Sequence, residues 1–104
     1  MIGGVNVNRA QNILDVDRIL NLSNYNKKIF KVPEDGIINV EAQWQPTSYA
    51  YVMIKDTKFR YASVSSPVGV NNYSQTNTSV PVYKDMELYL EIGPNGKIIY
   101  IPFK

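Results

Sequence analysis

The chain has 104 residues, with eleven basic and nine acidic side chains, a formal net charge of +2, and neither histidine nor cysteine. This length allows one domain. The absence of imidazole and thiol groups removes the commonest general base and the most reactive nucleophile, so we expect no enzyme and no cofactor. It also excludes disulfides and thiolate metal sites, which fits a reducing compartment or a particle assembled in one.

The first 28 residues differ in pattern from the remainder, and we expect an N-terminal arm or attachment segment at 1–28 and a β-sandwich domain at 29–104. Four apolar residues of the arm stand at helical spacing among poor helix formers, which favours a short helix or an ordered coil. They are Ile13, Val16, Ile19 and Leu20. We expect these apolar side chains to dock onto another surface.

No feature of the sequence indicates export or insertion into a membrane. The first residues lack the basic start and apolar core of a signal peptide, and no apolar run approaches the ~20 residues needed to span a bilayer. We therefore expect neither a signal peptide nor membrane insertion.

From Ile29 onward the apolar period becomes two, which is typical of strands. The expected elements are strands at 29–32 and 38–44, a hairpin of 49–55 with 58–64, strand structure from 80 and over 86–92, a turn at 93–96 and a last strand at 97–103. Trp44 is in phase with the apolar side of its strand and is expected in the core. Short strands with frequent turns predict an all-β antiparallel β-sandwich, jelly-roll-like, with a short N-terminal arm or helix.

Strands 49–55 and 97–103 are apolar on both faces, which is unusual for a small monomeric sandwich. We expect a second copy of the chain to cover them. The interface residues predicted on this basis are Tyr49, Tyr51, Met53 and Tyr100, since tyrosine offers rigid contact area with a polar tip. Simple strand propensity explains the same residues equally well.

Residues 65–79 contain a polar run that predicts an exposed loop. Asn71, Asn72, Tyr73 and Gln75 are the candidate ligand-binding residues, because amides bond sugar hydroxyls and a tyrosine ring can stack on a sugar or a protein partner. A plain solvated loop is the favoured alternative.

Three further patterns have ordinary structural interpretations. Glu87 and Glu91 could act as a pair of glycosidase carboxylates, but alternating strand positions favour a solvated face. Asp15 and Asp17 lack further ligands at loop spacing, so we expect no structural metal. Residues 59–61, Phe-Arg-Tyr, match single-strand nucleic-acid binders, but the basic stripe is missing and nucleic acid is not expected as a partner.

Two segments carry a resemblance to a known family. Residues 30–40, FKVPEDGIINV, resemble the opening strands of trimeric jelly-roll heads of the complement and tumour-necrosis-factor type. Residues 79–90, SVPVYKDMELYL, resemble a strand pair of the same heads, which bacteriophage tail-fibre and receptor-binding proteins also use. The resemblance spans about 29–103.

This resemblance implies a homotrimer on a phage virion, assembled in the host cytoplasm beside other virion proteins. Its apolar strands would pack around a threefold axis, and its loops would face a saccharide or protein of the host surface. The expected function is a non-enzymatic tail-tip or receptor-binding head. The alternatives are a capsid-decoration or connector subunit without a ligand site, and a small nucleic-acid-binding barrel.

Overall fold

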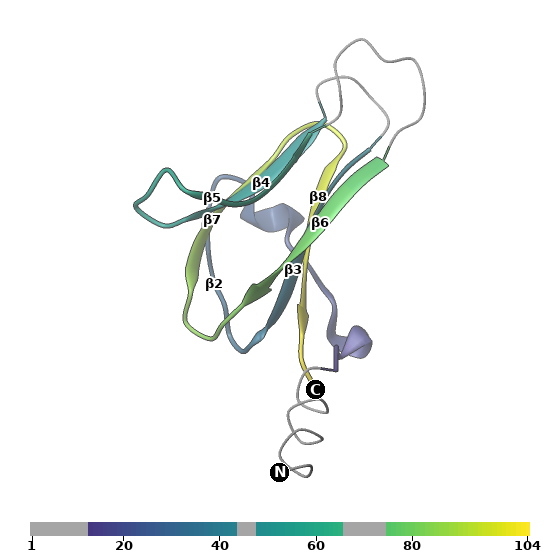
Figure 1. Ribbon diagram of the computed structural model, residues 1–104, viewed down its shortest axis with the longest axis vertical. Coiled ribbons are helices and arrows are strands. Elements are labelled where there is room, and N and C mark those ends of the chain that lie inside the picture. Colours follow the sequence, from purple (N-terminus) through teal and green to yellow (C-terminus); the bar gives the residue numbers. More distant parts are fainter. Residues whose placement is uncertain (1–12, 44–47, 66–74) are drawn as a thin grey trace, which may run out of the picture.

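Residues 13–43, 48–65 and 75–104 are described by a computed structural model, in which two antiparallel four-stranded sheets pack face to face (Figure 1). The first sheet has the order β1-β8-β3-β6 and the second the order β2-β7-β4-β5. The strands are β1 (Leu20–Asn21), β2 (Ile29–Lys31), β3 (Gly36–Gln43), β4 (Tyr49–Ile54), β5 (Arg60–Ser65), β6 (Gln75–Val82), β7 (Glu87–Ile92) and β8 (Gly96–Pro102). Two 3-10 turns, η1 (Val16–Arg18) and η2 (Ser23–Tyr25), flank β1.

The strand pairing is that of a jelly roll. The first strand pairs with the last, β2 with β7, β3 with β6, and β4 with β5. Two further pairings, β3 with β8 and β4 with β7, join these ribbons into the two sheets. A long antiparallel ribbon rolled in this way gives the eight-stranded, double Greek-key sandwich, so the predicted fold class is confirmed.

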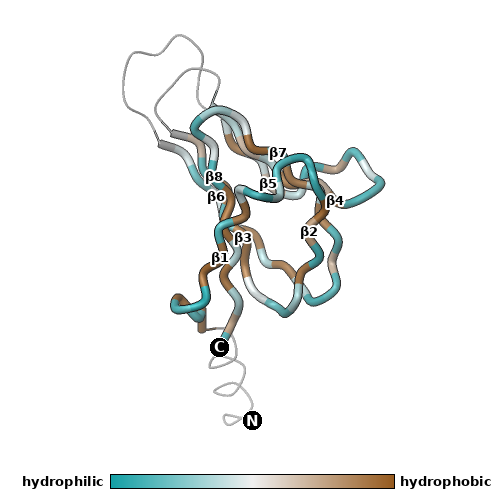
Figure 2. Tube along the Cα trace, turned by 180° about the vertical axis from the view of Figure 1, so that it is seen from behind, coloured by the Kyte–Doolittle hydropathy of each residue, from teal (hydrophilic) through white to brown (hydrophobic). Residues whose placement is uncertain are grey.

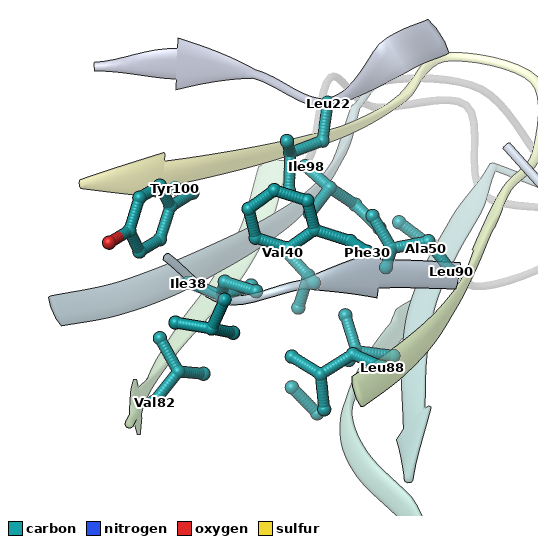
Figure 3. Packing of buried hydrophobic residues seen from close by; sticks show 13 residues of the cluster. Leu22, Phe30, Ile38, Val40, Ala50, Val82, Leu88, Leu90, Ile98 and Tyr100 are labelled. Atoms are coloured by element: carbon teal, nitrogen blue, oxygen red, sulfur yellow. The ribbon is translucent and has the colours of Figure 1, made fainter. Parts of the chain in front are cut away.

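The core lies between the two sheets and follows the period of two. Ile38 and Val40 of β3, Val52 of β4, and Leu88 of β7 have no exposed surface. Figure 3 shows the side chains of both sheets converging on Phe30, whose ring contacts Tyr25 and Tyr100 at centroid distances of 5.2 and 5.4 Å. The alternation read from the sequence places the inward side of β4 correctly, with Ala50 and Val52 buried.

The described part of the expected arm, residues 13–28, is built into the sandwich. β1 forms the edge of the first sheet by pairing with β8, and Leu22 is fully buried in the core. Lys27 donates its backbone N–H to the carbonyl of Leu90 on β7. The 3-10 turn η1 is shorter than the helix allowed by the apolar spacing.

Tyr100 corrects one prediction about the surface. It is 3 % exposed, its ring lies in the core, and its hydroxyl donates to the carbonyl of Glu34. Its register partner Ile38 also faces inward. Tyr100 is therefore a core residue and not part of a subunit interface.

The last strand also needs less cover from a second copy than its sequence suggests. Ile101 is 8 % exposed, and residues 14–18 lie along this end of β8. Leu14 bridges to Phe103, and Asp15 donates its N–H to the carbonyl of Pro102 at 2.8 Å.

The predicted polar loop is shorter than expected, because β6 begins at Gln75. Gln75 pairs with Gln43, and the threonines at 76 and 78 pair with Ala42 and Val40. The polar composition of the first part of β6 favours a loop in the sequence, although threonine is β-branched and favours strands. Asn71, Asn72, Tyr73 and Trp44 lie outside the described residues.

Candidate binding face

The outer face of the second sheet gathers aromatic and charged side chains from three strands. Tyr51 pairs with Ser63 of β5 and with Glu91 of β7. In the next row, Met53 pairs with Arg60 and with Tyr89. Paired residues share a face, so the predicted interface residues Tyr49, Tyr51 and Met53 lie together, and Tyr89 joins them.

Within this face, Tyr49, Tyr51 and Arg60 form a ladder that we call the Tyr–Arg stack. The two rings are stacked with their centroids 6.1 Å apart and an interplanar angle of 20°. The guanidinium carbon of Arg60 lies 4.3 Å from the centroid of the Tyr51 ring, which is cation–π geometry. A β-bulge between Val52 and Met53 shifts the register of β5 at this point, and re-aiming side chains is a common effect of such bulges.

Glu91, on the neighbouring strand β7, holds the Tyr–Arg stack in place. The hydroxyl of Tyr49 donates to Oε2 of Glu91 at 3.1 Å. This bond to a carboxylate raises the pKa of Tyr49, because a phenolate would lose the bond and face a negative charge. The pKa of Tyr51 is also raised, first by burial and then by Glu91.

The turn between β7 and β8 holds Tyr49 in place. Gly93 donates its N–H to the carbonyl of Tyr49 at 2.8 Å. A Cβ atom at Gly93 would lie 2.3 Å from the Tyr49 ring, so only glycine permits this close approach. The side chain is therefore preorganised by the backbone beside it.

A depression of about 310 Å³ opens beside the stack. It is lined by Tyr49, Tyr51, Arg60, Ser63, Val64, Ser65 and Glu91. A neighbouring depression of about 330 Å³ lies around Met53 and Tyr89 on the same sheet. The first one combines a cation, a carboxylate, hydroxyls and aromatic rings, which are the groups that orient a small polar ligand.

A second surface feature lies along the segment that leads into β1. Ile13, Val16, Ile19 and Leu20 are all large apolar residues with between 43 % and 61 % of their surface exposed. Figure 2 shows hydrophobic positions recurring along this segment, close to the end of β8. We call these four residues the apolar edge.

Arg18 anchors the apolar edge to the sandwich. Its guanidinium donates to Asp15, to both carboxylate oxygens of Glu34, and to the carbonyl of Phe103, at distances from 2.8 to 3.3 Å. The pKa of Asp15 is lowered by the bond from Arg18. Four contacts from one guanidinium fix the position of this segment relative to β8.

The other candidate sites are divided among separate partners. Glu87 forms an ion pair with Lys55 at 2.7 Å, which lowers its pKa, whereas Glu91 is bound by Tyr49. Phe59 and Tyr61 have their rings 6.4 Å apart, but Arg60 is stacked on Tyr51 instead of lying between them. The hydroxyl of Tyr61 donates to the carbonyl of Pro81. This arrangement does not favour a stacking platform for bases.

The depression was missed in the sequence because its residues come from three strands. In the sequence, Arg60 is part of a possible nucleic-acid motif and Glu91 is part of a possible pair of carboxylates. Their proximity to Tyr51 depends on the strand register and on the bulge in β5. The period of two alone could indicate only that Tyr49, Tyr51 and Met53 share a face.

Comparison with family models, curated proteins and solved structures gives no match to this chain. In the described part of the structure, no helix has the length and apolar character required to cross a membrane.

Proposed function

We propose that this protein is a non-enzymatic, self-associating binding subunit of a bacteriophage-type particle, acting in a tail tip or receptor-binding head. The jelly-roll strand order supports this proposal, since the trimeric heads that the sequence resembles share that architecture. Fold alone does not assign a function, so the proposal rests on the surfaces of the molecule.

The observation that carries the proposal is the apolar edge. Four large apolar side chains are exposed within eight residues, on a segment that Arg18 and the pairing with β8 hold in place. Scattered exposed apolar residues are normal, but a concentration of them on an ordered segment marks an interaction site. Other copies of the chain are the proposed partners, and the family resemblance favours a trimer.

Association through the apolar edge leaves the candidate binding face open. The apolar edge lies by the end of β8, where Asp15 bonds to Pro102. Tyr49 lies by the beginning of β8, where the carbonyl of Tyr49 adjoins Gly96. Six residue steps of an extended strand separate Pro102 from Gly96 by roughly 20 Å, and Leu20, which pairs with Tyr100, lies four steps or roughly 13 Å from Gly96 along the strand. A symmetric oligomer would therefore present several copies of the binding face, so that weak single sites add to a useful avidity.

The test compares two exposed apolar residues of equal exposure. Val16 is 61 % exposed on the apolar edge, and Phe59 is 62 % exposed on the β4–β5 hairpin. We expect Val16→Asp to have the solution mass of a monomer when it is measured by light scattering. The reason is that the new charge would have to be desolvated in the interface. Phe59→Asp should keep the mass of the parent protein.

If the parent and both variants have equal masses, the apolar edge is not the interface. If only Phe59→Asp loses the oligomer, the interface lies on the β4–β5 hairpin instead. Circular dichroism melting of both variants would verify folding, which neither substitution should disturb because both side chains are largely exposed.

A further inference from the structure

We propose that the depression beside the Tyr–Arg stack is a binding site for a neutral saccharide. This inference rests on the proposed function of a recognition subunit and places its ligand on the outer face of β4, β5 and β7. The predicted loop residues Asn71, Asn72 and Tyr73 are not required for it.

The charges of the depression are available to a ligand. Within the described residues, Arg60 has no carboxylate partner; its observed contact is the stacking on the Tyr51 ring. Stacking fixes the plane of the guanidinium while its N–H groups remain able to donate at the rim. Glu91 accepts a bond from Tyr49 and also interacts with the hydroxyl of Tyr51, and a carboxylate with about four lone-pair sites still has acceptor capacity for a ligand.

The combination of these groups favours a neutral, polyhydroxylated ligand. Among its described lining residues the depression has one cation and one carboxylate, so an anionic or a cationic ligand would meet one like charge at close range. Each sugar hydroxyl both donates and accepts. It can therefore pair with the carboxylate of Glu91, the guanidinium of Arg60, and the hydroxyls of Ser63 and Ser65.

The site is also rigid, which lowers the entropic cost of binding. Tyr49 is held by Glu91 and by the turn at Gly93, and Tyr51 is held between the ring of Tyr49 and Arg60. Tyrosine and serine together are the residues that give rigid contact area and adaptable hydrogen bonds in recognition surfaces. A volume of about 310 Å³ is at the lower end of the range for small-molecule sites.

The experiment uses the full chain on an array of immobilised neutral and acidic oligosaccharides. We expect retention of neutral glycans by the parent protein. A retained neutral oligosaccharide is then titrated in solution against the parent and four variants. Arg60→Ala and Glu91→Gln should each weaken its binding by about tenfold or more, since each removes charge-assisted hydrogen bonds.

Lys31→Ala is the matched control. It removes a cation from β2 of the same sheet, and its side chain is 64 % exposed and outside the lining of the depression. The affinity of this variant should equal that of the parent. Ser63→Glu is a further variant, in which the larger side chain fills the depression. Ser63 is exposed, as is Arg60, so these substitutions should have little effect on folding. Ser63→Glu should abolish binding.

Four outcomes would overturn the saccharide site: no retained glycan, retention of acidic glycans alone, unchanged affinity in the Arg60 and Glu91 variants, or a lower oligomer mass in Ser63→Glu. The last outcome would identify a second copy as the occupant. The proposed function fails separately, because it depends on the mass of the parent and of the Val16 variant.

Discussion

At the scale of single residues, the pairing of Tyr49 with Glu91 couples the binding face to pH. The neutral phenol donates to the carboxylate, and its ionisation would break that bond and place two negative charges side by side. The pKa of Tyr49 is therefore raised in the folded protein. Its contribution to stability is complete below the ordinary tyrosine pKa of about 10 and is lost as the pH rises through the folded value.

Glu91→Gln tests this coupling. The amide keeps the shape of the side chain but removes its charge, so the pKa of Tyr49 should fall towards its ordinary value. A spectrophotometric titration of the tyrosines should show Tyr49, and to a smaller extent Tyr51, ionising at lower pH than in the parent, because burial also raises the pKa of Tyr51. Glu87→Gln is the control, because Glu87 lies on the same strand but pairs with Lys55; an equal change in both variants would contradict the assignment.

Tyr100 shows which residue-level features could not be predicted from the sequence. On β8 the residues of both faces are apolar, so the period of two gives the strand but not its phase. The phase is set by the pairing with β3, which places Tyr100 opposite Ile38 and turns it inward. On β4 the same ambiguity was resolved correctly, and Tyr49, Tyr51 and Met53 do share the outer face.

At the scale of elements, the segment from η1 to η2 belongs to the sandwich. β1 is only two residues long, yet it completes the first sheet and places Leu22 in the core. The backbone of Leu22 donates to the carbonyl of Ile98 at 2.9 Å, which extends the pairing beyond β1. Short edge strands of this kind also limit unwanted pairing with other chains.

Substitution of two leucines separates core packing from exposed surface in this segment. Leu22→Ala should lower the free energy of unfolding by about 2–5 kcal/mol, because it leaves a cavity at a fully buried position. Leu20→Ala should cost under about 1 kcal/mol, since 43 % of that side chain is exposed. Denaturant unfolding of both variants measures the difference. Similar losses would mean that the segment is not anchored through Leu22.

The sequence predicted most strands because their alternation is local. The β4–β5 hairpin and the run from β7 through the turn at 93–96 to β8 are confirmed close to their expected bounds. The first part of β6 was missed, because polar residues at Thr76 and Thr78 conceal an inward face. The role of residues 20–28 was missed for a different reason: a two-residue strand carries no periodic signal.

At the scale of the whole molecule, the jelly roll separates two surfaces with different chemistry. The apolar edge has exposed aliphatic side chains, and the Tyr–Arg stack has a fixed set of hydrogen-bonding groups. The role proposed for the first surface is association, and the role proposed for the second is recognition. Aliphatic surface without polar partners suits contact between copies, whereas the fixed polar groups suit a small ligand.

Self-association is tested most directly by the solution mass of the parent protein, measured by light scattering after size exclusion over a dilution series. A persistent oligomer, with a trimer mass expected from the family resemblance, is the predicted result. A monomer at every concentration would contradict the account, because the apolar edge would then have no partner among copies of this chain.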